Sequence, residues 1–335
     1  MKRFTILALV LGMLGTFVPG AAQAKTLAYS SFFPPTHDQS KLAEEWGNEV
    51  ERRTNGKVKV NFFPGGTLTS AKECYDGVVQ GISDIGFSVL GYSRGRFPVM
   101  AAVDLPLGYR SGQAATQVAN AVFEQFQPKE FNDVQVMYFH AHGPGLLHTA
   151  KKPVRTMDDL KGLKIRATGN SGLLVSALGG TPVTMSMPDS YQAIQRGVVN
   201  GGMYPLETNK GWKMAEVVDY LTESYSVAYT TVFFVVMNKD RWNSLDSESQ
   251  QAIAEINREW VGKHATAWDE SDIDGRRYFL ERGGEVISLD EAESARWKEA
   301  ARPMLNDYVQ QADSKGLPGQ KILDFIISTL TDTQQ

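Results

Sequence analysis

Arg166 is the residue whose type and position most directly suggest chemistry. It ends a strand predicted over 163–166, and a helix of small residues is predicted over 171–178, after a short turn. In sheets built from parallel strands, ligands bind outside the carboxyl ends of the strands. A guanidinium at such an end, beside the free amides of a helix N-terminus, offers an anion two kinds of hydrogen-bond donor. The sequence therefore predicts an anion-binding site at Arg166.

Signals for catalysis are weak by comparison. The run Gly169–Gly172 lacks the last glycine of a nucleophile elbow. Asp158 and Asp159 precede a polar turn, which favours a solvated helix cap over a catalytic pair of carboxylates. No phosphate-binding loop is present, and the first strand–helix connection, 30–38, carries no glycine, which excludes a dinucleotide fingerprint. We therefore predict no catalytic residue and no cofactor, and do not expect an enzyme.

Three histidines raise the question of a metal site. His140 and His142 are spaced to share one face of a strand, and His148 follows closely. No carboxylate or cysteine stands at ligand spacing beside them, so structural or ligand-contacting histidines are favoured over a metal site. We predict no metal, and whether His140 and His142 touch a ligand stays open.

The elements that position Arg166 are predicted to alternate as strand, helix, strand, helix, strand. Their ranges are 163–166, 171–178, 182–185, 191–196 and a last strand that starts near Gly201. Such an alternation is most simply built with parallel strands.

A similar order occurs earlier in the chain. GVVQG at 77–81 and GVVNG at 197–201 each follow a predicted helix and precede a predicted strand, the first of them over 82–87. The repeat suggests two domains of similar construction that face each other across a cleft. Glycines that cap helices are common, so a coincidence is the alternative.

The N-terminal half also contains an unusual aromatic loop. After a strand predicted over 26–29, Phe32 and Phe33 are followed by two prolines. Rigid prolines at a strand end can hold aromatic surface against a ligand, or the loop can be a hydrophobic plug at a domain edge.

Longer elements are predicted in the C-terminal half. The range 225–237 has the composition of a buried strand that crosses back between domains. The range 246–282 is predicted to be one long helix lying across both domains. A last long helix is expected from just after Ser288 to about Lys315, with Ser288 and Glu291 at the spacing of a capping box.

Composition limits the class of protein. The 335 residues carry a net charge of −4 and no basic run, so nucleic acid is not an expected partner. Residues 1–24 have the charged start, the apolar stretch and the small-residue end of a secretory signal, with cleavage expected after Ala24; an uncleaved anchor is the alternative. The single cysteine, Cys74, cannot form an internal disulfide.

Several segments together resemble a known family. They are DDLKGLKIR (158–166), ALGGTPVTMSMPDSYQAIQRGVVNGG (177–202), FFPGGTL (62–68), DGVVQGISDIGF (76–87) and VVMNKDRWNSL (235–245). In order and spacing they are similar to the extracytoplasmic solute-binding proteins of TRAP (tripartite ATP-independent periplasmic) transporters, the DctP family. The resemblance covers essentially the whole chain after the predicted signal.

The resemblance implies an architecture and partners. It implies an α/β protein with two similar domains around a ligand cleft, joined by crossing strands and braced by the long helix. The expected domains are 25–143 plus about 236–275, and about 144–235 plus 276–335. The protein would be a periplasmic monomer that delivers its ligand to the small and large membrane subunits of the transporter, driven by a sodium gradient.

The resemblance also implies a site. In this family the arginine that ends the GLKIR-type strand forms a two-pronged salt bridge with the ligand carboxylate, which assigns that role to Arg166. Phe32, Phe33, Phe87, Tyr204 and Trp212 would leave a small, partly aromatic cavity. Four polar residues are placed to read a hydroxyl or an amine: Ser31, Ser88, Thr168 and Glu207. For Glu207, a salt bridge to Lys210 is an equal alternative.

Two departures from the family pattern bear on the ligand. Leu146 stands where members that bind sialic acid have a second arginine, and Met203-Tyr204-Pro205 stands where they read ENP. Because a dianion in a dry cleft would lack a second cation, we expect a small organic monoanion. Carboxylates and sulfonates both fit: hydroxy acids, 2-oxo acids, or hydroxyalkyl sulfonates such as isethionate. The alternatives are a compact aromatic acid as ligand, a ligand-sensing module for a receptor, and a secreted enzyme.

Overall fold

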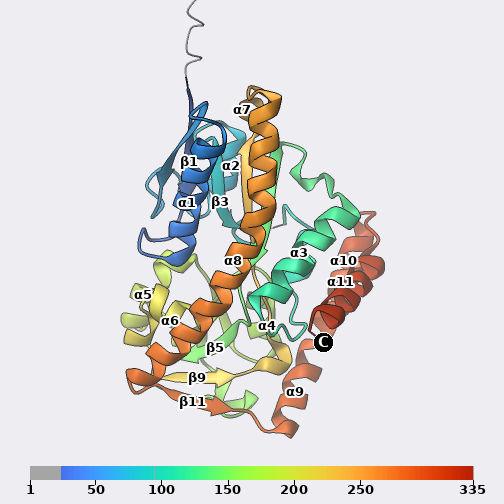
Figure 1. Ribbon diagram of the computed structural model, residues 1–335. Helices are drawn as coiled ribbons and strands as arrows, with labels where there is room; N and C mark the ends of the chain where they lie inside the picture. The colour runs from blue at the N-terminus through green and yellow to red at the C-terminus, as the bar shows by residue number, and fades with distance from the viewer. Residues whose placement is uncertain (1–23, 94, 335) are drawn as a thin grey trace, which may run out of the picture.

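The strands form two sheets in the computed structural model, which describes residues 24–93 and 95–334 (Figure 1). The predicted signal, up to residue 23, lies outside the described residues. The first sheet has the order β2-β1-β3-β10-β4, in which β1 is parallel to β2 and β3, and β10 is antiparallel to β3 and β4. Its strands are β1 (Lys25–Ser31), β2 (Val58–Phe63), β3 (Ile85–Val89), β4 (Val134–Ala141) and β10 (Val232–Asn238).

The second sheet has the order β11-β9-β5-β8-β6-β7. Its strands are β5 (Leu146–Thr149), β6 (Lys164–Ala167), β7 (Thr181–Thr184), β8 (Gly201–Tyr204), β9 (Tyr220–Glu223) and β11 (Glu285–Ser288). β6 pairs in parallel with β7 and β8, and α4 (Asn170–Ala177) and α5 (Met187–Gln195) connect these strands. The predicted strand–helix alternation around Arg166 is confirmed.

The chain passes between the sheets at three places. Residues 142–145 lead from β4 to β5, residues 224–231 lead from β9 to β10, and α8 (Ser247–Glu281) leads from the first sheet to β11. Figure 1 shows α8 running along both halves of the molecule, as predicted for the long helix. In its first half, the Trp260 indole N–H donates to the Leu42 carbonyl on α1 (Asp38–Arg53) at 2.8 Å. In its second half, Arg276 pairs with Glu223 of β9 at 2.6 Å.

The core of the first sheet lies on both of its faces. Along β10, Val232, Phe234 and Val236 join α2 (Cys74–Val79), α3 (Gly112–Phe126) and α11 (Gly319–Thr333) in one cluster. Phe233 and Val235 face the other way, toward the cluster that holds α1 and α8. Packing on both faces is why the strand is apolar without alternation.

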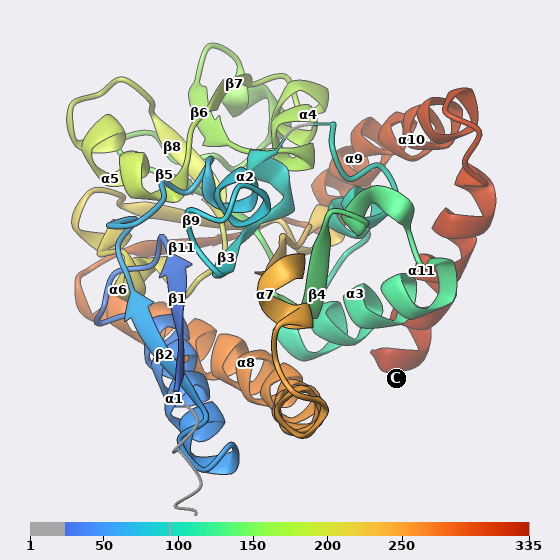
Figure 2. The ribbon, with the colours of Figure 1, turned by 90° about the horizontal axis from the view of Figure 1, so that it is seen from above.

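The C-terminal helices divide between the sheets. α9 (Glu291–Ala301) and α10 (Pro303–Ser314) lie near α4, whereas α11 packs against α3 beside the first sheet (Figure 2). The predicted domain boundaries, which put 276–335 in the second domain, stay a prediction. The end of that range, α11, packs against α3, a helix of the first predicted domain. No described helix has the length and apolar character needed to cross a bilayer.

Several predicted boundaries were wrong. The helix predicted over 191–196 is α5, which begins at Met187. The strand predicted over 82–87 begins at Ile85, because Gly81 turns the chain at a φ of 73° and Ile82 is exposed. The predicted strand 225–237 begins only at Val232. The last long helix is two helices, since Pro303 starts α10, and the N-cap of α9 is Asp290, whose side chain accepts from the Glu293 N–H; Ser288 instead ends β11.

Candidate functional site

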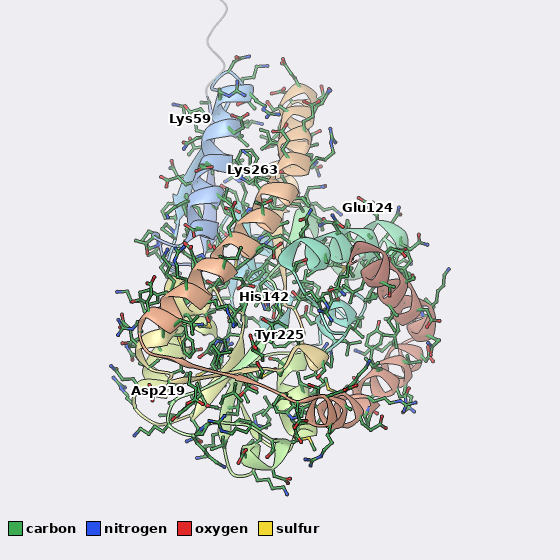
Figure 3. The ribbon with its side chains drawn as sticks, turned by 60° about the horizontal axis from the view of Figure 1, so that its bottom comes forward. Lys59, Glu124, His142, Asp219, Tyr225 and Lys263 are labelled. Carbon is green, nitrogen blue, oxygen red and sulfur yellow. The ribbon has the colours of Figure 1, made fainter. Side chains whose placement is uncertain are left out.

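A cavity lies where the two sheets meet, and it holds about 410 Å³ of space between atoms, counting the part open to solvent. The first-sheet side contributes residues after β1 and β3, the second-sheet side residues after β6 and β8, and the crossing segments close the back. Figure 3 labels His142, one of the residues from a crossing segment, near the middle of the molecule. The lining residues are Phe32, Phe33, Val89, Tyr92, His142, Arg166, Thr168, Met187, Tyr204, Pro205, Glu207, Thr208, Trp212, Tyr229, Thr231 and Phe233.

Arg166 is the cation of this cavity. It is the third residue of the four-residue strand β6, which precedes α4, and only 4% of it is exposed. Its Nε donates to the Met185 carbonyl at 3.2 Å and its Nη1 to the Met203 carbonyl at 3.3 Å. Within the described ranges, no carboxylate oxygen lies within 4.0 Å of the guanidinium. A buried positive charge without a counter-charge is costly, so the arrangement favours an anion at this position.

The neighbours of Arg166 are polar but uncharged. Burial raises the pKa of Tyr92, Tyr204 and Tyr229 above the ordinary value of a phenol, although Arg166 acts against part of this rise. Burial lowers the pKa of His142 to about 4, so this imidazole is neutral at pH 7. The Tyr204 hydroxyl is buried and has no hydrogen-bond partner among the described residues. An anion on Arg166 would therefore meet hydroxyl groups and a neutral imidazole at this end of the cavity.

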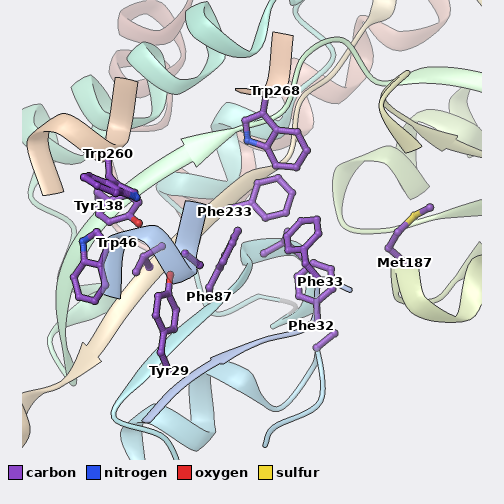
Figure 4. Close-up of a cluster of buried hydrophobic side chains, with 14 of the residues drawn as sticks. Tyr29, Phe32, Phe33, Trp46, Phe87, Tyr138, Met187, Phe233, Trp260 and Trp268 are labelled. Atoms are coloured by element: carbon purple, nitrogen blue, oxygen red, sulfur yellow. The ribbon is translucent and has the colours of Figure 1, made fainter. Parts of the chain in front are cut away.

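Aromatic rings form one side of the cavity. Phe32 stacks on Phe33 at a centroid distance of 4.4 Å and on Trp212 at 6.0 Å. Phe33 also approaches Phe233 at 5.6 Å. Figure 4 shows these phenylalanines side by side, with Met187 opposite them on the segment from the second sheet. The cavity thus combines one charged end with an apolar, flat wall.

Glu207 lines the same cavity, but it does not pair with Lys210, the partner considered from the sequence. Its Oε2 accepts from His37 Nε2 at 3.0 Å. Lys210, the alternative partner, pairs with Asp274 at 2.8 Å. Glu207 directly precedes the short helix α6 (Thr208–Gly211).

Seven of the ten predicted site residues line the cavity, and three do not. Those that line it are Arg166, Phe32, Phe33, Thr168, Tyr204, Glu207 and Trp212. The Ser88 hydroxyl donates to the Ala71 carbonyl at 2.7 Å, and the Ser31 hydroxyl accepts from the Phe33 N–H at 3.3 Å. Phe87 is fully buried behind Phe33, with ring centroids 5.1 Å apart.

The three histidines have separate environments. His142 lines the cavity. His140 accepts from the Trp268 indole N–H at 2.9 Å, and His148 stacks on Tyr204 at 4.4 Å. In the part of the chain that the structure describes, no group of three or more His, Cys, Asp or Glu side chains is arranged to hold a metal ion.

Sequence reasoning missed Tyr92, Met187 and Phe233. The Tyr92 hydroxyl accepts from the Met187 N–H at 2.8 Å, a contact between the two sides of the cavity. Tyr92 follows β3 in a run without periodicity, so its sequence context carries no signal. Phe233 lies in a strand that was predicted, but the strand is apolar on both faces, and its cavity face cannot be told from the pattern.

Two α/β halves that enclose one buried cation define a two-domain binding protein for a small acid. The family comparison is specific: the model of bacterial extracellular solute-binding protein family 7, DctP, matches residues 29–311. The chain belongs to this family of periplasmic solute-binding proteins of TRAP transporters. The family and fold class predicted from the sequence are confirmed.

Individual relatives agree with this assignment. The 2,3-diketo-L-gulonate-binding periplasmic protein YiaO of Escherichia coli (strain K12) is 28% identical over 294 residues, which are 85% of this chain and 88% of that one. A TRAP periplasmic solute-binding protein of Desulfovibrio salexigens, solved as an open complex, is 33% identical, with a TM-score of 0.81 over 92% of this chain and 96% of that chain. A marine metagenome TRAP protein specific for aromatic acids, solved with 3-hydroxybenzoate, is 28% identical, with a TM-score of 0.88 over 93% and 99%.

Proposed function

We propose that this protein captures a small organic monoanion in the periplasm and delivers it to the small and large membrane subunits of a TRAP transporter for ion-gradient-driven uptake. The observation that carries the proposal is the buried guanidinium of Arg166, which lines a cavity and has no acid partner among the described residues. A carboxylate or sulfonate would accept the two-pronged hydrogen bond that the guanidinium offers.

The charge of the cavity supports a monoanion. Among the described residues, Arg166 is the only arginine or lysine that lines it, and Leu146, at the position of a second arginine in some relatives, is fully buried outside it. A second negative charge would be desolvated without a partner. Small hydroxy acids, 2-oxo acids and hydroxyalkyl sulfonates such as isethionate meet this condition.

A compact aromatic acid is a second candidate. The stack of Phe32, Phe33 and Trp212 offers a flat apolar surface on which a ring can lie. The marine relative that binds 3-hydroxybenzoate makes this candidate concrete. The anionic head of an aliphatic or an aromatic ligand would occupy the same place at Arg166.

A thermal-shift screen tests the proposal. The chain from Lys25 onward is melted with a panel of carboxylates, sulfonates, amines and neutral sugars, and the screen is repeated with Arg166→Gln. A ligand at one hundred times its Kd adds about 2.7 kcal/mol to the free energy of unfolding, or about four degrees in Tm for a chain of this size. Arg302→Gln is the matched control, because Arg302 is exposed and pairs only with Glu299.

We expect at least one small anion to raise the Tm of the wild type and of Arg302→Gln, but not of Arg166→Gln. A response to amines or sugars alone, or a response that survives in Arg166→Gln, would contradict the proposal. Recovery of the anion unchanged from the complex distinguishes binding from turnover.

A further inference from the structure

Glu207 is a second charged group on the cavity wall. Its side chain is 3% exposed. It lines the cavity together with Arg166, yet the two side chains form no ion pair within 4.0 Å. The cavity is therefore bounded by a cation and by a carboxylate that do not neutralise each other directly.

One oxygen of the Glu207 carboxylate is held by a neutral donor. His37 Nδ1 accepts from the Gln39 N–H at 3.2 Å, so the imidazole proton lies on Nε2. That Nε2–H donates to Glu207 Oε2 at 3.0 Å. His37 comes from the first-sheet side and Glu207 from the second, so the bond forms across the cleft. In this tautomer His37 fixes the carboxylate without cancelling its charge.

The backbone of Glu207 is also fixed. Its N–H donates to Asp272 Oδ1 on α8 at 2.7 Å. Burial and the nearby negative charge of Glu207 raise the pKa of Asp272 well above the usual carboxyl range, so Asp272 adds no second charge. Glu207 is thus positioned by α8 from behind and by His37 from one side.

The other carboxylate oxygen is free. Glu207 Oε1 has no hydrogen-bond partner within 24–93 and 95–334, whereas Oε2 is taken by His37. The side chain lines the cavity and also the surface groove beside α1 and α8, so it forms part of the wall between them. A nearly buried acceptor of this kind favours a ligand that brings a donor to it.

We propose that Glu207 is a specificity-determining residue that selects monoanions carrying a hydroxyl or ammonium group at the end remote from the anionic head. The inference rests on the proposed function, since the anionic head must first be held by Arg166. A ligand with an apolar end would cover the accessible surface of Glu207 Oε1 without offering it a donor, and a dianion would place a second negative charge against it. Either defect weakens binding roughly ten- to a hundredfold.

Matched ligand pairs test the inference directly. Dissociation constants are measured by isothermal titration calorimetry for 3-hydroxybenzoate and benzoate, 4-hydroxybutyrate and butyrate, and 3-hydroxypropionate and propionate. We expect the wild type to bind the hydroxylated member at least about tenfold more tightly in the pair whose length fits the cavity. This comparison needs no variant. Equal binding within every pair overturns the inference.

Glu207→Gln separates the charge from the shape. Its amide oxygen can still accept from His37, while its NH₂ group presents a donor where the wild type presents an acceptor. We expect the preference for the hydroxylated member to fall to about threefold or less, with the Kd of the other member unchanged or lower. Glu216→Gln is the control, because Glu216 is an exposed carboxylate near α6 that contacts Tyr191 instead of the cavity. A preference that persists in Glu207→Gln overturns the inference.

The two proposals fail in different ways. If Arg166→Gln weakens both members of each pair and the pairs do not differ, the proposed function stands and the role of Glu207 is refuted. If Arg166→Gln changes nothing, or neither a carboxylate nor a sulfonate binds, the proposed function falls and the inference falls with it.

Discussion

Replacing Arg166 with methionine should make the closed conformation more stable when no ligand is bound. The described conformation is closed around the cavity: the Tyr92 hydroxyl accepts from the Met187 N–H, and the Asn170 amide donates to the Ala101 carbonyl at 2.7 Å. In that state the guanidinium is 4% exposed and its recorded hydrogen bonds go to two carbonyls. When the cleft opens, water can reach the charge again. We therefore expect Arg166 to oppose closure until an anion binds.

The size of this opposition follows from the contacts. Burying an ion costs several kcal/mol after relaxation, and each hydrogen bond from a charged donor returns about 1.5–3 kcal/mol. Because both bonds are long, at 3.2 and 3.3 Å, we take the low end of this range, about 3 kcal/mol for the pair. Set against a burial cost of about 4–6 kcal/mol, this leaves a net cost of about 1–3 kcal/mol for closing without ligand. Methionine is shorter, but it keeps an unbranched apolar stem and carries no charge, so Arg166→Met should shift the equilibrium toward the closed form by roughly five- to 150-fold.

Small-angle X-ray scattering measures the effect. We expect the radius of gyration of unliganded Arg166→Met to match that of the liganded wild type, while the unliganded wild type is larger. The same substitution at exposed Arg302 should leave the radius unchanged. If unliganded Arg166→Met is as expanded as the unliganded wild type, the charge does not control closure. If the variant instead melts several degrees lower, the two carbonyl contacts support the fold and the reasoning is wrong.

Other consequences can be measured one by one. Tyr92→Phe removes the hydroxyl that accepts the N–H at the start of α5, at a cost of about 1 kcal/mol, so calorimetry should show roughly three- to tenfold weaker binding; unchanged affinity would remove the contact from the closing mechanism. Burial lowers the pKa of His148 to about 3, so below pH 6.5 the unfolded chain binds a proton that the folded one does not, and stability is lost as the pH falls. In urea titrations between pH 6.5 and 4.5, His148→Gln should lose about 1.4 kcal/mol less per pH unit than the wild type; parallel slopes would contradict this. Gly275→Ala places a Cβ against the Leu206 carbonyl and should lower the free energy of unfolding by about 1–3 kcal/mol in the same urea assay. Gly262→Ala, in open space on the same helix, should raise it by about 0.5–1 kcal/mol. Equal effects of the two substitutions would refute the close approach of α8 to Leu206.

Local patterns predicted much of the fold. The alternation around Arg166 and the helix 247–281 were predicted because each depends on periodicity and glycine stops within one segment. The pairing of β11 with β9, and of β5 with both β8 and β9, joins segments far apart in the chain, and no local signal specifies such pairs. The division of the predicted last helix into α9 and α10 did have a local signal that was overlooked. Proline favours the first turn of a helix, and Pro303 begins α10.

The site residues show the same contrast between local signals and contacts that join distant segments. Arg166 could be placed from the end of its own strand. Glu207 was selected as a candidate, but its partner His37 lies 170 residues away in the chain, and the nearby Lys210 was the only partner visible in sequence. Ser88 was selected for its hydroxyl, which the backbone carbonyl of Ala71 occupies.

The attachment of α8 has a mechanical consequence. Near Trp260 the helix is fastened to α1, and Glu259 adds a contact to Arg53 at 2.6 Å. Near Asp272 it is fastened to the segment after β8. The span between the two attachments is about 18 Å of helix. Because both attachments lie on one continuous helix, a rotation of one half against the other would bend this span, and the cost of bending would oppose the rotation.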